Sequence, residues 1–193
     1  MMQNKYTKEN ILKKLLLIII LIGIVTIALL YSFKPQIMQT IYPIKYQEHV
    51  KKSAQEMGID ELLIYSIIKA ESGFEANVKS ASGAIGLMQI MLPTAEEIAR
   101  ELGIEDITEK QLYEAETNIK IGTKYFSMLL DAYDNKLNLA IIAYNAGMGN
   151  VNAWIEDGTI NEQGTDIENI PFAETKMYVK KILQNYEIYK EIY

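Results

Sequence analysis

Apolar residues follow two different patterns along the chain. Residues 15–33 form a nearly continuous apolar run, whereas apolar residues after residue 46 recur at intervals of three and four. A run of roughly 20 apolar residues is long enough to cross a bilayer as a helix, and the spaced pattern is typical of amphipathic helices. The spaced pattern predicts helices over residues 46–57, 60–72, 94–102, 115–133, 136–146, 150–155 and 173–189. We therefore expect a mainly α-helical domain behind an N-terminal transmembrane helix.

A carboxylate interrupts the apolar face of the predicted helix over residues 60–72. Glu71 lies seven residues after Ile64 and four after Ile67, which places it on the same helix face. Burial and the partial negative charge at the C-terminal end of a helix both disfavour the ionised form, so both raise the pKa of Glu71. A carboxylic acid that remains protonated near neutral pH can protonate the leaving oxygen of a glycoside. Glu71 is therefore a candidate acid catalyst.

A glycine-containing loop is a candidate wall of a ligand-binding site. Gly83 and Gly86 can adopt positive φ angles, which lets a ligand approach the backbone closely. Gln89 carries an amide that can bond to sugar groups, and Met91 offers soft apolar contact. For Met91 taken alone, packing in the core is the simpler expectation.

The predicted helix over residues 136–146 also carries a polar group on its apolar face. Tyr144 lies seven residues after Leu137, where an apolar residue is expected. A buried phenol needs a hydrogen-bond partner, so Tyr144 is either a core tyrosine or, if two helix ends converge, a partner that orients Glu71. Asn145 is expected to cap or brace the turn through its side chain.

Several short segments together carry a family resemblance. They occur in a fixed order: Glu71-Ser72-Gly73, Gly86-Leu87-Met88-Gln89-Ile90-Met91, Ala143-Tyr144-Asn145-Ala146-Gly147, then Pro171-Phe172-Ala173-Glu174-Thr175 and Tyr178. From about Tyr46 to the C-terminus, the chain resembles the catalytic domain of the soluble lytic transglycosylases, relatives of goose-type lysozyme. The resemblance implies a lysozyme-like fold and cleavage of the MurNAc-GlcNAc β-1,4 bond of peptidoglycan, with formation of 1,6-anhydro-MurNAc ends.

The resemblance also implies roles for individual residues. Glu71 would act twice, first as an acid to the glycosidic oxygen and then as a base to the C6 hydroxyl of the same sugar. Tyr144 becomes a second catalytic candidate, and Ser72 is expected to support the helix end. The expected substrate-binding residues are Ser80, Gln89, Met91, Asn145 and Glu174. One departure is Ala76, where relatives often carry proline, and it affects the expected path of the loop rather than the acid.

Two alternatives remain open at the level of sequence. A hydrolytic muramidase on the same fold would use water in place of the C6 hydroxyl, with Glu174 as the candidate second carboxylate. Glu174 also suits the first turn of the last helix, where the helix dipole favours a negative charge. A non-catalytic glycan-binding scaffold is the other alternative, although binding alone has no use for a buried acid.

Composition excludes several other chemistries. The chain has no cysteine, so thiol nucleophiles, disulfides and Cys-ligated metals are ruled out. Its single histidine, His49, lies in a polar helical stretch, and no Walker, dinucleotide-binding or zinc-helix motif occurs. We expect no metal and no cofactor.

The N-terminal region predicts membrane attachment. Leu15 to Phe33 should insert, and the lysines before it favour a cytoplasmic N-terminus and an extracellular catalytic domain. No convincing small-x-small cleavage site follows, so an uncleaved signal anchor is favoured over a signal peptide. The expected division is a cytoplasmic basic tail (1–14), a single transmembrane anchor (15–33), a tether (34–45) and the catalytic domain (46–193).

Charge supports this division. Residues 1–34 contain five lysines and one glutamate, so a whole-chain charge of −6 leaves −10 for residues 35–193. An acidic outer domain argues against nucleic acid as a partner, because nucleic-acid binding calls for a basic face. The expected partners are peptidoglycan glycan strands and the membrane, and cell-envelope machinery is left open as a further partner.

Overall fold

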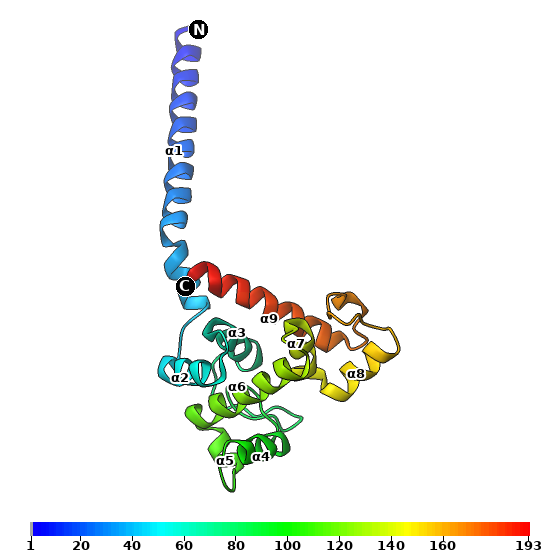
Figure 1. Ribbon diagram of the computed structural model, residues 1–193. Coiled ribbons are helices and arrows are strands. Elements are labelled where there is room, and N and C mark those ends of the chain that lie inside the picture. Colours follow the sequence, from blue (N-terminus) through cyan, green and yellow to red (C-terminus); the bar gives the residue numbers. More distant parts are fainter. Residues whose placement is uncertain (1) are drawn as a thin grey trace. The chain divides into compact units, whose positions relative to one another are not determined.

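The computed structural model describes the backbone of residues 2–193 and the side chains of residues 13–193. The chain divides into two compact units between Pro43 and Ile44. The first unit consists mainly of helix α1 (Met2–Ile41), and the second contains the helices α2 to α9 (Figure 1). The predicted basic tail includes Lys5, Lys8 and Glu9. Their side chains lie outside the described residues.

Helix α1 contains the predicted membrane segment. Lys13–Ile41 is the one stretch of the described residues that is long and apolar enough to span a membrane as a helix. The helix continues beyond Phe33, through Pro35, to Ile41, so much of the predicted tether is helical. Proline removes one backbone donor and weakens one turn, but the residues around it keep a helical conformation here. Residues 42–46 form the non-helical connection.

The second unit is built almost wholly from helices, which confirms the predicted fold class. Within residues 2–193 no strand is present, and two isolated β-bridges join Lys79 to Ile85 and Ile85 to Ile90. The helices are α2 (Gln47–Met57), α3 (Glu61–Glu71), α4 (Leu92–Glu101), α5 (Glu109–Leu112), α6 (Ala115–Ala132), α7 (Leu137–Ala146), α8 (Met148–Glu156), the 3-10 helix η1 (Ile167–Asn169) and α9 (Ala173–Ile192).

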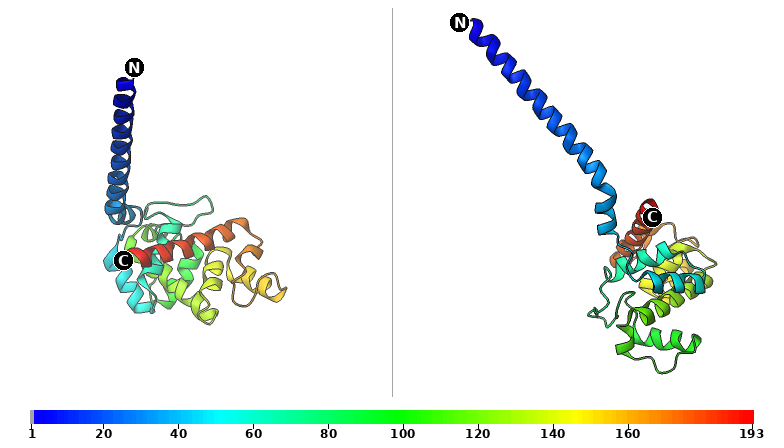
Figure 2. Two further views of the ribbon diagram at one scale, coloured as in Figure 1. Left: turned by 90° about the horizontal axis from the view of Figure 1, so that it is seen from above. Right: turned by 90° about the vertical axis from the view of Figure 1, so that its left-hand side faces the viewer.

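Helix α6 forms the centre of this unit. It packs against α2, α4, α5 and α7, and α7 packs in turn against α8 (Figure 1). The middle of α7, residues 139–143, is apolar on every side and fully buried, as expected for a helix surrounded by others. Helix α9 runs along one side of the unit and is seen in orange to red in both views of Figure 2.

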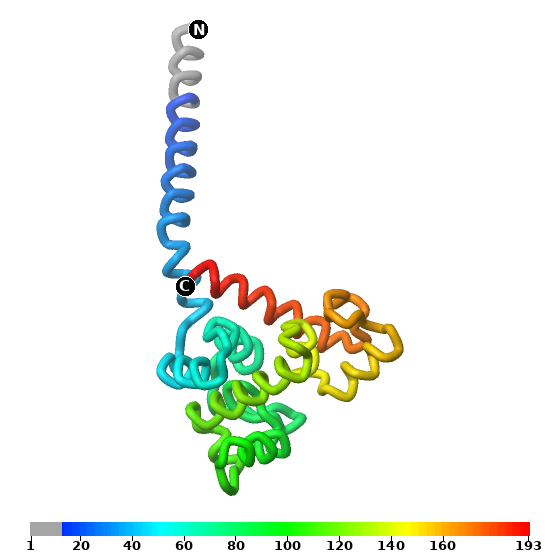
Figure 3. Tube along the Cα trace, in the orientation of Figure 1, coloured from blue at the N-terminus to red at the C-terminus, as the bar shows by residue number. Residues whose placement is uncertain are grey.

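Two long connections join the helices of this unit. The long connection between α3 and α4 folds back on itself through the two β-bridges, and its course is traced in Figure 3. The connection over residues 157–170 is mostly exposed. Ile160 and Ile170 are its buried apolar residues and η1 lies between them, so these two side chains contribute to the core.

Candidate active site

Glu71 is the last residue of α3. Asp60 begins this helix by accepting a hydrogen bond from the backbone nitrogen of Leu62 at 2.9 Å, which is a standard N-cap. Residues 63–68 are buried, so this part of the helix is enclosed on every side rather than on one face. Glu71 follows at the helix end, where its side chain is partly buried.

The phenol that binds Glu71 is Tyr178 of α9. Its hydroxyl donates a hydrogen bond to Glu71 Oε1 at 2.5 Å, and its ring is buried. Tyr144 was the candidate for this contact if the two helix ends converged. The Tyr144 hydroxyl donates instead to the backbone carbonyl of Met88 at 2.8 Å, so Tyr144 braces the loop before α4. Periodicity identifies the face of a residue but does not decide which of two phenols reaches a carboxyl group.

Burial dominates the electrostatics of Glu71. It raises the pKa of the carboxyl group from 4.5 to about 7, although the hydrogen bond from Tyr178 and the charge of Lys181 both lower it. The negative charge of Glu174 raises the pKa of Glu71 by a smaller amount. A carboxyl group that titrates near neutral pH can both donate and accept a proton there. Burial also raises the pKa of Tyr144 and of Tyr178, so both phenols are neutral donors.

Three elements hold the backbone of Leu87 and Met88. Ser72 donates its hydroxyl hydrogen to the Leu87 carbonyl at 2.8 Å, which confirms that it supports the end of α3. Tyr144 binds the Met88 carbonyl, and the Met88 nitrogen donates to the side-chain oxygen of Asn118 on α6 at 2.8 Å. This loop is therefore fixed against α3, α6 and α7 together.

Asn118 is a site-building residue that sequence reasoning missed. It is fully buried, and its amide nitrogen donates to the carbonyls of Ile85 and Leu112 at 2.9 and 2.8 Å. Gly86 lies against it with a φ of +76°, and a Cβ atom there would come within 2.4 Å of the Asn118 amide nitrogen. A buried asparagine on an amphipathic helix was the available signal, but two of its three partners, Met88 and Ile85, are 30 and 33 residues away in sequence.

A cavity of about 290 Å³ opens beside this loop. Four of the predicted site residues line it, namely Gln89, Met91, Tyr144 and Asn145, and they are joined by Ile90, Thr94, Tyr125, Ala146 and Gly147. Met91 is 40 % exposed, so the expectation of core packing for it is wrong. Its position directly before α4 turns its side chain to the cavity. Gln89 adopts a left-handed backbone conformation, with φ of +47°, and its amide nitrogen donates to the Gly86 carbonyl at 2.8 Å.

The other predicted residues take different positions. Ser80 does not line this cavity, and its hydroxyl oxygen accepts a hydrogen bond from the Ala84 nitrogen at 3.0 Å within a tight turn. Asn145 was expected to bond to nearby backbone, but its side-chain oxygen accepts from the Thr175 hydroxyl at 2.6 Å and so ties α7 to α9. Glu174 is exposed in the first turn of α9, as predicted, and acts on Glu71 through its charge.

Comparison with known proteins identifies the family of this arrangement. The family model described as transglycosylase SLT domain matches residues 48–166. The chain belongs to the transglycosylase SLT domain family. Its relatives include the soluble lytic murein transglycosylase of Salmonella typhimurium, 37 % identical over 145 residues that make up 74 % of this chain and 22 % of the relative. The membrane-bound lytic murein transglycosylase C of Shigella sonnei is 32 % identical over 161 residues, 72 % of this chain and 44 % of that protein.

Solved structures agree with the family assignment. The 70 kDa soluble lytic transglycosylase of Escherichia coli superposes with a TM-score of 0.72 at 31 % identity, covering 80 % of this chain and 25 % of that one. An inactive mutant of the lytic transglycosylase Slt of Pseudomonas aeruginosa gives 0.72 at 32 % identity, with the same coverage. The chain thus spans about a quarter or less of the soluble relatives it matches.

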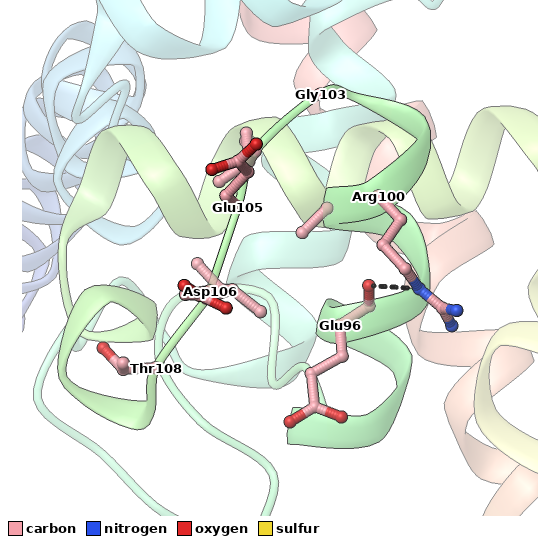
Figure 4. Close-up of a pocket in the computed structure, with 9 residues that line it drawn as sticks. Glu96, Arg100, Gly103, Glu105, Asp106 and Thr108 are labelled. Atoms are coloured by element: carbon pink, nitrogen blue, oxygen red, sulfur yellow. Dashed lines mark hydrogen bonds between the residues drawn. The ribbon is translucent and has the colours of Figure 1, made fainter.

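A second, larger hollow in this SLT domain contains none of the predicted site residues. Its volume is about 850 Å³, and it lies between α4 and the segment leading to α5 (Figure 4). Glu96, Glu105 and Asp106 bring carboxylates to its walls, and the Arg100 side chain donates to the Glu96 carbonyl at 3.3 Å. Among the side chains of residues 13–193, no cluster of His, Cys, Asp or Glu suitable for a metal ion is found.

The contact between Tyr178 and Glu71 leads to a first prediction. Tyr178→Phe removes a hydrogen bond that favours the carboxylate, so the pKa of Glu71 should rise and the alkaline limb of the pH-rate profile should move to higher pH. We also expect a loss of roughly tenfold in rate, because a bond to a charged group is worth about 1.5 kcal/mol or more. The rate of turbidity loss of purified cell walls measures both effects.

Tyr144→Phe is the matched control for this variant. It also removes one buried hydroxyl, but that hydroxyl is bonded to the Met88 carbonyl rather than to Glu71. Its alkaline limb should therefore move less than that of Tyr178→Phe. If the alkaline limb moves further in Tyr144→Phe than in Tyr178→Phe, Tyr144 rather than Tyr178 orients Glu71.

Proposed function

We propose that this chain is a peptidoglycan lytic transglycosylase in which Glu71 serves as both acid and base. The observation that carries the proposal is the partly buried Glu71 carboxyl group, with a pKa of about 7, bound by the Tyr178 phenol. Family membership supports peptidoglycan as the substrate. The cavity lined by Gln89, Met91 and Asn145, which Tyr144 but not Glu71 also lines, offers both polar and apolar groups for binding a sugar.

The proposed reaction has two steps. Protonated Glu71 first gives its proton to the glycosidic oxygen, the bond between that oxygen and C1 of MurNAc breaks, and the N-acetyl group of the same sugar helps to stabilise the cationic C1. The Glu71 carboxylate then removes the proton of the C6 hydroxyl as the C6 oxygen bonds to C1. The 1,6-anhydro ring closes, Glu71 regains its proton, and no water is consumed.

The remaining predicted residues support this reaction from around the carboxyl group. Tyr144 and Ser72 hold the loop that carries Gln89 and Met91, and we assign Gln89, Met91 and Asn145 to direct sugar contact. Ser80 shapes the turn at the start of the same loop. We assign Glu174, exposed at the start of α9, to the rim of the site, where its charge helps to keep Glu71 protonated.

Product analysis tests the proposed function. The tethered C6 hydroxyl should outcompete water, because an intramolecular nucleophile has a high effective concentration. Digested peptidoglycan should then carry anhydro-MurNAc ends, which are one water lighter than hydrolysis products and resist borohydride reduction. Mass spectrometry of borohydride-treated fragments reports both properties. Predominantly reducible ends would refute the proposal and would favour a muramidase with Glu174 as the base.

We also propose that α1 anchors the enzyme in the membrane, with the N-terminus in the cytoplasm and the catalytic domain outside. The apolar stretch Lys13–Ile41 supports anchoring, and the lysines that precede the apolar run support the orientation. One relative of this chain is named a membrane-bound lytic murein transglycosylase. The proposed boundaries remain a basic tail to residue 14, an anchor over residues 15–33, a connection to residue 45 and the catalytic domain from residue 46.

This topology predicts the fate of the full-length chain in cells. It should stay in the membrane fraction, and protease added to intact spheroplasts should digest the catalytic domain. Lysed spheroplasts provide the control for protease access, and a cytoplasmic protein provides the control for intactness. Recovery of a soluble form that begins after Phe33 would indicate a cleaved signal peptide, and protection in intact spheroplasts would reverse the orientation.

A further inference from the structure

A lysine of α9 binds the end of the helix that carries Glu71. The Lys181 ammonium group donates a hydrogen bond to the Ala70 carbonyl at 2.7 Å, and Ala70 directly precedes Glu71. Lys181 follows Tyr178 by three residues, so the two side chains share one face of α9. Helix α9 therefore brings a phenol to the carboxyl group and a positive charge to the backbone beside it.

We propose that Lys181 is a positioning residue that balances the charge of Glu71, so that one carboxyl group can release a proton and recover it within a single reaction cycle. This inference rests on the proposed function. The proposed function assigns proton transfer to Glu71, and the role of Lys181 is to adjust how readily Glu71 transfers that proton.

A nearby positive charge is needed because burial alone only strengthens the hold of Glu71 on its proton. A desolvated carboxyl group holds its proton tightly, which makes it a weak acid for the first step. The groups that face Glu71 are Tyr178, Lys181 and Glu174 from α9 and Tyr144 from α7. Of these, Lys181 supplies positive charge, whereas Glu174 adds negative charge and the two phenols are neutral.

The position of Lys181 carries an electrostatic cost. Lys69 of α3 lies near enough for the charge of Lys181 to lower the pKa of Lys69, in addition to the larger effect of burial. Two like charges at one helix end repel each other, but both face the negative end of the α3 dipole. The neighbouring Lys180 pairs with Glu168. We infer that the charge of Lys181 serves Glu71 rather than only the attachment of α9.

Four variants of the full chain test this inference. Lys181→Met removes the charge and the donor, Lys181→Gln removes the charge but keeps a donor, and Lys181→Arg keeps both. Lys180→Met is the matched control, because it removes a lysine of the same helix that pairs away from Glu71. Two measurements are made on each variant: the titration of the Glu71 carboxyl carbon by ¹³C NMR and the pH-rate profile of wall clearance.

Loss of the charge should raise the titration midpoint of Glu71 by about half a unit or more, and the alkaline limb of the profile should move up with it. In Lys181→Arg and Lys180→Met, the titration midpoint of Glu71 and the alkaline limb of the profile should stay at their wild-type positions. If Lys181→Met and Lys181→Gln lower the melting temperature but move neither the midpoint nor the limb, Lys181 only attaches α9 to α3 and the inference is overturned. If the unchanged protein clears no wall, the proposed function fails, and the NMR midpoints still decide the role of Lys181.

Discussion

Glu71→Gln should abolish wall clearance while leaving the fold intact. Glutamine has nearly the same shape and can still accept the hydrogen bond from Tyr178, but it cannot donate a proton as an acid does. General acid catalysis contributes about 10² to 10⁴ in rate, and Glu71 is proposed to act in both steps. We therefore expect a loss of at least about a thousandfold. Turbidity loss of purified walls measures the rate, and circular dichroism checks the fold.

The same variant should gain stability at alkaline pH. The folded-state pKa of Glu71 is raised from 4.5 to about 7, so the native state binds this proton more tightly than the unfolded state does. The resulting penalty is absent below pH 4.5, grows as the pH rises, and is complete above about pH 7. Glu71→Gln removes the penalty, and its free energy of unfolding should exceed that of the unchanged protein by at most roughly 2 to 3 kcal/mol at pH 8. At pH 4 the two proteins should unfold alike.

Glu75→Gln is the matched control for Glu71→Gln. Glu75 lies four residues away and is exposed, so its substitution should change neither the rate nor the stability appreciably. Wall clearance by Glu71→Gln at near the normal rate would remove Glu71 from the mechanism. Lower stability of Glu71→Gln at pH 8 would contradict the pKa on which the mechanism depends.

The second large effect is expected from Asn118→Ala. The substitution removes the side-chain partner of the Met88 nitrogen and of the Leu112 carbonyl, and both residues are buried. The Ile85 carbonyl loses the same partner but still accepts a hydrogen bond from the Ile90 nitrogen at 3.0 Å. Each unsatisfied buried group costs about 1 to 3 kcal/mol, so we expect destabilisation by roughly 3 to 5 kcal/mol. The rate of wall clearance should fall as well, because the same bonds hold the loop that carries Gln89. Denaturant unfolding measures the stability.

Asn152→Ala is the control for Asn118→Ala. Asn152 is exposed and accepts one hydrogen bond from the Tyr133 hydroxyl at 3.0 Å, so its loss should cost less than about 1 kcal/mol. Similar stabilities for the two variants would show that the loop is held by packing rather than by Asn118.

The helices of the catalytic domain could be predicted because their apolar residues follow the helical period. Each of the seven expected helices is present, with ends that differ by up to two or three residues. Helix α5 and η1 were missed because four and three residues are too few to display a period. The continuation of α1 through Pro35 was missed because a proline favours, but does not force, the end of a helix.

The site was predictable where its residues lie on one element and not where they meet across several. The position of Glu71 on its helix follows from local spacing. Its phenol partner lies 107 residues away on α9, and the loop before α4 is held by a side chain of α6 some 30 residues on. Such contacts depend on tertiary packing, which no local pattern encodes. Tyr178 was part of the family resemblance, but only the packed structure joins it to Glu71.

Digestion of purified peptidoglycan in water enriched in oxygen-18 tests the central claim most directly. If the C6 hydroxyl closes the ring and Glu71 serves as both acid and base, water is not a reactant. Mass spectrometry should then find anhydro-MurNAc ends without the heavy isotope, in fragments that Glu71→Gln does not release. MurNAc ends that carry oxygen-18 would show that water attacks C1, and this result would contradict the transglycosylase mechanism.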